Sequence, residues 1–299
     1  MCILLICMRK SFKYRLYPTK FQLGKLEFTL YLCRNLYNCA LEERIKAYKS
    51  KGVTLSYKDQ ANELPKVIEE LPEYKEVFSQ VKQDVLKRID KSYQGFFRRV
   101  KAKGEKAGFP RFQGRNRYNS FTYPQSGFKL EDNNRLYLSK IGSVKVKMHR
   151  PIVGIIKTCT IKCEGNQWYV VFSCDIGDAQ AKNIDWNNDV GIDVGITTFT
   201  VTSDDEFLES PRPMKAAKKK LRREQRSLSR KKKGSNRRKK QANKVAKLHL
   251  KVKRQRDDFQ HKLSRYLVDK YDVIYYEALN IKNMVRNHKL AFHIADSAW

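Results

Sequence analysis

Apolar and polar side chains alternate through residues 12–16, which predicts a short β-strand near the start of the chain. The helix that follows has a clear start, because Thr19 and Gln22 have the spacing of a capping box. Between residues 26 and 48 apolar side chains recur every three or four positions, so this helix buries one face until Gly52 ends it. The chain therefore opens with a strand and one long amphipathic helix.

The helical period returns in residues 57–70 and again in residues 78–103. Together with the first helix, these segments predict a small helical domain over residues 20–107. The last of the three helices ends in an aromatic face that turns basic at Arg98 and Arg99.

From residue 108 the pattern changes to short alternating segments, which are typical of β-structure. We expect strands at residues 135–138, 143–148, 155–163 and 167–176. The turn Glu164-Gly165-Asn166 joins the last two as a hairpin.

Cys159 and Cys163 fall on one face of their strand by its period of two, so we interpret them as core side chains rather than metal ligands. The polar segment 177–188 marks a boundary, and residues 1–19 and 108–188 are assigned to one β module.

A third region, residues 189–299, combines strands with long basic helices. Strands are expected at residues 190–202 and 272–277. Between them a break at Gly234-Ser235, with Ser235 as the N-cap, predicts a helical hairpin. The second helix of the hairpin keeps an apolar stripe, which predicts that one of its sides packs: Val245, Leu248, Val252, Phe259, Leu263 and Leu267.

Length and charge limit the class of protein. The 299 residues are enough for about two domains with real cores. No apolar run approaches the roughly 18–20 residues that span a bilayer, so we expect a soluble protein and no integral membrane protein. Lys and Arg number 63 against 31 Asp and Glu, a net charge of +32 that repels itself unless a polyanion neutralises it. Nucleic acid is the expected partner.

The basic hairpin carries most of this charge. Residues 215–256 contain 21 Lys or Arg and one acid, Glu224. The alternatives are a solvated helix or a disordered basic arm, but ion pairs within the helices cannot offset the repulsion when acids are nearly absent, which favours phosphate binding. The candidate phosphate-binding residues of the hairpin are Arg222, Arg223, Arg230, Lys231, Lys232, Lys233, Arg237 and Arg238.

A second candidate surface interleaves rings with guanidinium groups over residues 109–123. Unstacked bases lie flat on rings and guanidinium planes, while phosphates take the charge. The same rings are equally well explained as the core of the β module, and both interpretations stay open here. The candidate nucleic-acid contacts in this part of the chain are Arg98, Arg99, Arg111, Arg115 and Arg117.

Two carboxylates could support chemistry. Asp193 sits in the middle of an apolar, β-branched strand between Gly191 and Gly195, and Glu277 ends a second apolar strand. We expect both strands to be buried, with a cation against Asp193, because an unpaired buried carboxylate costs several kcal/mol. Two acids on neighbouring strands are suitable ligands for Mg²⁺ and for metal-assisted phosphodiester cleavage. The alternatives are a backbone-satisfied or Lys-paired Asp193 and a helix-terminal Glu277.

The segment 191–198 also matches the first phosphate loop of actin-like and sugar-kinase ATPases. That fold needs a second phosphate loop and an adenosine loop, and the sequence after residue 198 contains basic helices instead. We therefore disfavour an ATPase.

Several motifs in order resemble the TnpB/OrfB family, the insertion-sequence proteins known as probable transposases and related to type V CRISPR effectors. The motifs are Tyr14-Arg15-Leu16-Tyr17-Pro18-Thr19, Phe96-Phe97-Arg98-Arg99, Gly108-Phe109-Pro110-Arg111-Phe112, Gly191-Ile192-Asp193-Val194-Gly195, Arg230-Lys231-Lys232-Lys233-Gly234-Ser235 and Glu277-Ala278-Leu279-Asn280-Ile281. The resemblance implies an α+β multidomain protein that is an RNA-guided DNA endonuclease, with guide RNA and target DNA as partners. Its expected parts are a wedge β-barrel, an inserted helical recognition domain and a RuvC-like nuclease domain of ribonuclease H fold. Asp193 and Glu277 match the first and second RuvC acids, which would bind Mg²⁺.

The family pattern continues beyond the printed sequence. After a helix expected to start near Asp296, relatives supply a four-cysteine zinc ribbon and a third catalytic Asp, and neither the zinc ligands nor that Asp occur here. On this basis we expect a C-terminally truncated chain with an incomplete Mg²⁺ site that cleaves DNA weakly or not at all. Two alternatives are a guide-dependent DNA binder or repressor without cleavage and a simple RNA-binding protein.

The cysteines and the first residues of the chain indicate the cellular compartment. The seven cysteines contain no C-x-x-C pair, so the sequence predicts neither a zinc ribbon nor a redox motif, and the cytosol is the expected compartment, with nucleoid association on DNA. Residues 1–7 are apolar but too short and wrongly flanked for a signal peptide. They are either an extension of the first strand or a stretch upstream of a true start at Met8.

Overall fold

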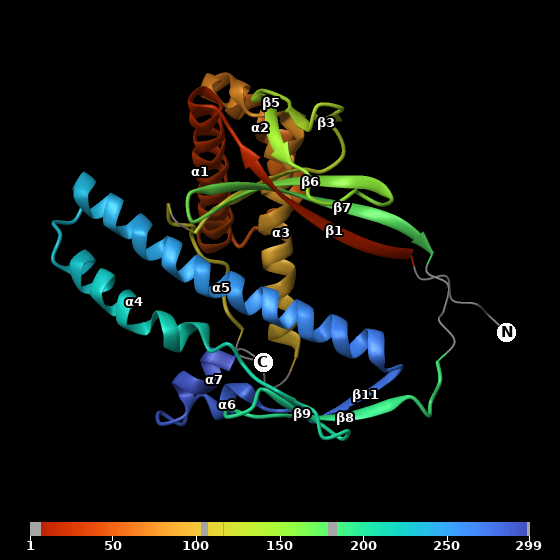
Figure 1. Ribbon diagram of the computed structural model, residues 1–299. Helices are drawn as coiled ribbons and strands as arrows, with labels where there is room; N and C mark the ends of the chain where they lie inside the picture. The colour runs from red at the N-terminus through yellow and green to blue at the C-terminus, as the bar shows by residue number, and fades with distance from the viewer. Residues whose placement is uncertain (1–6, 103–106, 116, 179–183, 298–299) are drawn as a thin grey trace. The chain divides into compact units, whose positions relative to one another are not determined.

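The computed structural model describes residues 7–102, 107–115, 117–178 and 184–297 (Figure 1). The chain divides into two compact units, residues 1–179 and 180–299. Both units mix helices with strands, so the predicted α+β class is confirmed. The finer domain boundaries at residues 19, 107 and 188 stay predictions. Expectations for residues 1–6 and for Trp299 lie outside the described residues.

The first unit is built on a seven-stranded antiparallel sheet. Its strands have the order β2-β6-β7-β1-β5-β4-β3, and the four strands expected between residues 135 and 176 are confirmed to within two residues at each end. The bounds are β1 (Cys7–Tyr17), β2 (Ser120–Tyr123), β3 (Phe128–Glu131), β4 (Arg135–Leu138), β5 (Gly142–Lys147), β6 (Ile155–Glu164) and β7 (Gln167–Asp178).

This sheet is strongly curled. Its edge strands β2 and β3 are joined by only residues 124–127, which reach no further than about 18 Å when extended. A flat sheet with strands about 4.8 Å apart would hold the two edges about 29 Å apart. The edges therefore curve toward each other, and the rings of Tyr123 and Phe128 lie 6.5 Å apart between their centroids.

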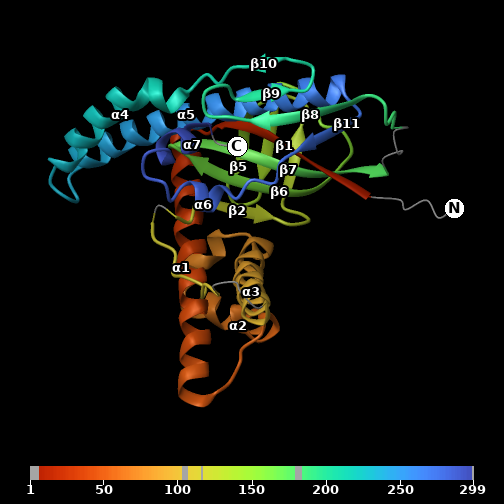
Figure 2. The same ribbon diagram turned by 90° about the horizontal axis from the view of Figure 1, so that it is seen from below.

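The helices α1 (Lys20–Lys51), α2 (Tyr57–Glu70) and α3 (Ser79–Lys101) are inserted between β1 and β2, together with a 3₁₀ turn at Pro72–Glu76. Helix α3 packs against both α1 and α2, and the three helices lie together in Figure 2. The predicted capping box of Thr19 and Gln22 is present, and Gly52 ends α1 with a φ of 65°, a left-handed conformation that favours glycine. The expected helical insertion is therefore confirmed as secondary structure.

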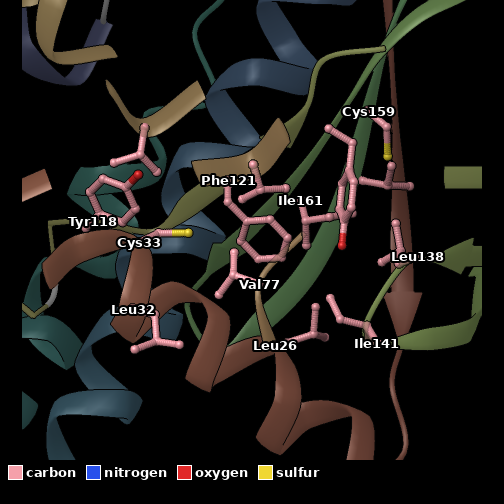
Figure 3. Close-up of a cluster of buried hydrophobic side chains, with 14 of the residues drawn as sticks. Leu26, Leu32, Cys33, Val77, Tyr118, Phe121, Leu138, Ile141, Cys159 and Ile161 are labelled. Carbon is pink, nitrogen blue, oxygen red and sulfur yellow. The ribbon is translucent and has the colours of Figure 1, made fainter. Parts of the chain in front are cut away.

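The helices and the curled sheet share one core (Figure 3). Leu26, Leu32 and Cys33 of α1 pack in the same cluster as Phe121 of β2 and Cys159 of β6, and all five side chains are buried. The interpretation of Cys159 as a core side chain is confirmed. Burying large apolar side chains from both layers ties the inserted helices to the sheet.

Glu164 links β1 to the β6–β7 hairpin. Its carboxylate lies 2.6 Å from Nζ of Lys13 and 2.8 Å from Nζ of Lys162, and 12% of its side chain is exposed. Burial raises the pKa of Glu164, but the hydrogen bonds from the two lysines outweigh burial and lower it to about 2. The ionised form is therefore favoured in the folded protein.

We expect Glu164→Gln to lower the free energy of unfolding at pH 7 by about 1.5–3 kcal/mol, the range for hydrogen bonds to charged groups. Because the folded pKa is depressed, this contribution is full above the ordinary pKa of 4.5 and is lost as the pH falls toward about 2. Urea unfolding at pH 7 and pH 3 checks this. The exposed pair of Lys46 and Glu42 gives the control, because Glu42→Gln should change little at either pH. An equal effect of Glu164→Gln at both pH values would contradict the assignment.

The second unit contains a four-stranded sheet with the order β10-β9-β8-β11. Its strands are β8 (Asp189–Val194), β9 (Thr200–Thr202), β10 (Phe207–Leu208) and β11 (Val273–Tyr276). β11 runs parallel to β8, and the other two pairings are antiparallel. A long connection containing helices separates the two parallel strands.

The single strand expected over residues 190–202 is wrong, because the chain turns at Gly195 and returns as β9. The amide of Gly195 donates to the carbonyl of Phe199 at 3.2 Å. A Cβ atom at Gly195 would lie 2.8 Å from the carbonyl oxygen of Thr198, so only glycine fits this close turn.

The helices of the second unit are α4 (Pro213–Ser229), α5 (Asn236–Lys270), α6 (Ile281–Met284) and α7 (Ala291–Ser297). The predicted hairpin is confirmed: α4 and α5 lie side by side, and the Ser235 hydroxyl accepts from the amide of Arg238 at 3.1 Å (Figure 1). All six residues of the apolar stripe on α5 are buried or half-buried. The helix expected to start near Asp296 instead begins at Ala291.

None of the helices in the described ranges combines the length and the apolar character that crossing a bilayer requires.

Candidate nucleic-acid interface and carboxylate pair

The outward side of α4 is a continuous cationic surface. Lys219, Arg222, Arg226 and Arg230 recur every three or four residues and are exposed. They lie along an open groove of about 1190 Å³, which is also lined by Lys215, Lys218, Lys220, Arg223 and Lys231. A groove of one charge attracts a polyanion over the whole length of the helix.

Glu224, the one acid within residues 215–256, is held on the side of α4 that meets α5. Gln241, a buried residue of α5, donates to the Glu224 carboxylate at 2.7 Å and to its carbonyl at 3.1 Å. This hydrogen bond lowers the pKa of Glu224, so the carboxylate stays ionised and bound to α5. Glu224 also lies 3.4 Å from a guanidinium nitrogen of Arg223, and residues 215–256 contain no other acid to compensate the remaining positive charges of the groove.

Among the hairpin residues predicted to bind phosphate, Arg238 has a structural role. Its Nη1 donates to the carbonyls of Leu228 at 2.7 Å and Lys231 at 3.1 Å. These hydrogen bonds satisfy backbone carbonyl groups at the end of α4 and just after it. Lys231 is half-buried and faces the groove. The remaining predicted residues of the hairpin are exposed: Arg222, Arg223, Arg230, Lys232, Lys233 and Arg237.

The first unit carries the other predicted arginines. Arg98, Arg111, Arg115 and Arg117 are exposed, whereas Arg99 is half-buried and donates to the carbonyl of Gly108 at 3.1 Å. Some of the rings around them belong to the core of the β module, and others are exposed and open to stacking with bases. Tyr118, Phe121 and Tyr123 are buried core residues, while Phe109 and Phe112 are 46% and 51% exposed.

The sheet of the second unit places the two candidate acids near the carboxyl ends of adjacent parallel strands. Tyr276, the last residue of β11, is paired with Ile192 of β8. Asp193 follows Ile192 within β8, and Glu277 follows Tyr276 directly after the end of β11.

The expectation that both acidic strands are buried is wrong. Asp193 and Glu277 are exposed, and Tyr275 and Tyr276 of β11 are 55% and 75% exposed. Within the described residues β11 pairs with β8 alone, which leaves its outer side open. An exposed carboxylate is hydrated, so the cation expected against Asp193 is not needed to offset burial.

Two acids supply fewer ligands than a complete metal site has. Among the residues that the structure describes, no group of three or more His, Cys, Asp or Glu is placed to hold a metal ion. The pair can contribute carboxylate oxygens, the ligand type that Mg²⁺ prefers, and leaves positions for water and phosphate.

Asp296 of α7 is a structural residue that the sequence does not reveal. Its buried carboxylate accepts from the amides of Met214 at 2.9 Å and Lys215 at 2.8 Å, and it lies 3.1 Å from a guanidinium nitrogen of Arg256. It therefore caps α4 from more than 80 residues away in sequence and joins α4, α5 and α7. No local spacing signals such a cap.

The fold and these surfaces define an α+β protein with a curled antiparallel sheet in one unit, and a cationic helical hairpin and two exposed carboxylates near the ends of adjacent parallel strands in the other. Residues 171–288 match the OrfB/IS605 family described as a probable transposase, and residues 8–52 match a helix-turn-helix domain of the same family. In this structure residues 8–52 form β1 and the single continuous helix α1.

Two relatives match nearly the whole chain. A protein of Streptomyces pristinaespiralis, named as an RNA-guided DNA endonuclease, is 33% identical over 300 residues, which cover 97% of this chain and 72% of the relative. InsQ of Escherichia coli (strain K12), also named as an RNA-guided DNA endonuclease, is 30% identical over 281 residues, or 93% of this chain and 68% of InsQ. The chain belongs to the OrfB/IS605 transposase family, also called TnpB/OrfB, as its motifs indicated.

Two solved structures are also similar. One is a Cas12f1–sgRNA–target DNA complex, with a TM-score of 0.37 and 13% identity, covering 97% of this chain and 80% of that protein. The other is a CRISPR-Cas12f ternary complex, with a TM-score of 0.33 and 14% identity, covering 89% and 64%.

Proposed function

We propose that this protein binds a guide RNA through its basic hairpin and, with that RNA, binds complementary DNA. The observation that carries the proposal is the cationic groove along α4, whose neighbouring acid is bound to α5. Single strands and duplexes both present closely spaced phosphates to such a surface. The relatives named as RNA-guided DNA endonucleases support RNA and DNA as the partners.

The topology supports the finer assignment of the two units. The curled sheet with helices inserted after its first strand is consistent with a wedge barrel that contains a recognition domain. In the second unit, three antiparallel strands are followed by a fourth that runs parallel to the first of them, and this order is consistent with the start of a RuvC-like, ribonuclease H fold. We infer that Asp193 and Glu277 occupy the positions of two nuclease acids.

We infer further that Asp193 and Glu277 together hold Mg²⁺. Their positions near the carboxyl ends of adjacent parallel strands and their exposure fit a hydrated hard cation, which when bound supplies Lewis-acid polarisation of a phosphodiester. Because a nuclease site surrounds its cations with more ligands than two acids, we expect these residues alone to support weak cleavage or none. A guide-dependent DNA binder that does not cleave is therefore the second candidate function, favoured by the absence of a third ligand near the pair among the described residues.

Asp193→Asn and Glu277→Gln should each weaken Mn²⁺ binding at least about tenfold, since each removes one charged ligand. Mn²⁺ substitutes for Mg²⁺ and is measured by water-proton relaxation. Asp189→Asn is the matched control, because Asp189 is also an exposed acid of β8 and should leave Mn²⁺ binding unchanged. Equal binding by all three variants and the wild type would remove the metal assignment.

The proposed function is tested by expressing the chain with its own flanking DNA, purifying it and sequencing the RNA that accompanies it. A discrete RNA derived from the adjacent locus supports guide binding. Footprinting on DNA complementary to that RNA then separates a guided protein from a simple RNA binder, which would protect no DNA. A mixture of cellular RNA, or none, would contradict the proposal.

A further inference from the structure

An aromatic cavity of about 720 Å³ lies within the helical insertion of the first unit. Its walls come from the last turns of α1, the C-terminal half of α3, the segment before α2, and Phe109. The volume is within the range of about 300–1000 Å³ that is typical of small-ligand sites. The cavity contains none of the residues assigned above to phosphate or metal binding.

The rings around this cavity present open faces. Phe109 packs edge-on against Tyr93 and Phe96, with centroids 5.6 and 5.2 Å apart, and Phe97 lies 5.2 Å from Phe96. Phe97 and Phe109 are nevertheless 47% and 46% exposed, and Tyr48 on the opposite wall is 65% exposed. A planar aromatic ligand would bury these faces and gain stacking energy beyond the area buried.

Arg44 adds a polar group with an unused donor. Its side chain is 5% exposed, its Nε donates to Gln60 at 2.8 Å, and its Nη1 donates to Asp90 at 3.3 Å. Its Nη2 is buried and has no acceptor in the described part of the chain. Buried donors are normally paired, so this nitrogen is suited to an acceptor on a bound molecule. The cavity wall also holds Gln94, which donates to Asp90 at 2.7 Å.

Positive charge flanks the same cavity. Lys49 lines it and is exposed, and Arg98, also exposed, follows Phe97 directly on α3. A ligand with a flat, hydrogen-bonding ring and an adjoining anionic group would complement both parts. A nucleotide within a strand has this chemistry, since its base is planar and its phosphates are charged.

We propose that this cavity accepts one unstacked base of a bound nucleic-acid strand, with its phosphates toward Lys49 and Arg98. The proposal rests on the proposed nucleic-acid function and adds a contact that does not depend on charge. The base stacks on Phe97 and Phe109, and an acceptor on its edge meets Arg44. Whether the strand is RNA or DNA is decided by the two arms of the test.

The test uses the full chain and 20-nucleotide RNA and DNA strands that carry 2-aminopurine at successive positions. Phe97→Ala should weaken binding of at least one strand about 5- to 150-fold, the equivalent of about 1–3 kcal/mol per stacked base. The dependence of affinity on salt should not change, because no phosphate contact is lost. In the wild type, 2-aminopurine fluorescence should change on binding at one position, where the base leaves the stack of its neighbours, and Phe97→Ala should abolish that change.

Matched variants separate stacking from other effects. Phe97→Tyr keeps an aromatic face and should bind like the wild type, whereas Phe97→Leu keeps only apolar volume and should bind weakly. Phe21→Ala removes an exposed ring of α1 outside the cavity and should have no effect. If Phe97→Ala lowers the melting temperature strongly, Phe109→Ala replaces it.

The outcomes are distinct. Loss confined to RNA or to DNA identifies the strand that supplies the base. Unchanged affinity of Phe97→Ala and Phe109→Ala, or wild-type affinity of Phe97→Leu, overturns the base site while leaving the proposed function intact. A wild-type chain that binds neither strand overturns the proposed function, and this inference with it.

Discussion

Replacing Lys219, Arg222, Arg226 and Arg230 with glutamine should weaken RNA binding at 0.1 M salt by between two and three orders of magnitude. These four side chains lie on one stripe of α4 and line its groove. Each phosphate contact on a single strand contributes about 0.7 to the slope of log affinity against log salt concentration, so four lost contacts should flatten the slope by about 3. Titrations of a labelled RNA at several salt concentrations measure both quantities.

The control must remove the same charge from another surface. Lys51, Lys58, Lys66 and Lys75 are exposed in the helical insertion, and their replacement with glutamine lowers the net charge equally. We expect this control to change the slope by less than about 0.7, the contribution of one phosphate contact. If both sets of substitutions weaken binding equally, the groove is not a contact site and only the total charge matters.

Asp296→Ala should destabilise the second unit by about 3–5 kcal/mol, the range for breaking a buried ion pair. The change leaves the half-buried Arg256 without its charge partner and uncaps the amides of Met214 and Lys215. Hydrogen exchange at those two amides should accelerate most, because they lose their acceptor directly. Urea unfolding gives the free energy, and mass-spectrometric exchange locates the change.

Two further variants test the cause. Arg256→Met combined with Asp296→Ala should recover part of the loss, because the unpaired charge is then removed. Asp258→Ala, which breaks the exposed pair with Lys262 on α5, should have little effect. If Asp296→Ala is as stable as the wild type, the carboxylate is not required to join α7 to α4 and α5.

Local signals in the sequence predicted most of the secondary structure. The capping box at Thr19, the stop at Gly52 and the N-cap at Ser235 are decided by neighbours within four residues, and all three are present. The strands of the first unit were predictable because alternation reflects a sheet with one buried face. Hydrophobic period and turn residues were therefore sufficient wherever the deciding contacts are short in sequence.

Distant contacts could not be predicted in the same way. An apolar strand sequence signals burial, but the exposure of Asp193 depends on which elements cover the sheet. The turn at Gly195 depends on the approach of the Thr198 carbonyl, and the β-branched residues on both sides of Gly195 hide it. The acid that caps α4 comes from α7, more than 80 residues later in the chain. The parallel pairing of β8 with β11, the strands that lead to Asp193 and Glu277, likewise joins segments that the whole hairpin separates in sequence.

The long insertion after β1 also shapes how the protein folds during synthesis. Lys13 of β1 and Glu164, which pair in the finished sheet, are separated by 151 residues. At about 5–20 residues per second, β1 waits roughly 8–30 s on the ribosome before β6 and β7 exist. Helices α1, α2 and α3 emerge first and can cover the apolar side of β1 in that interval. The inserted helices would then shield the nascent strand from aggregation.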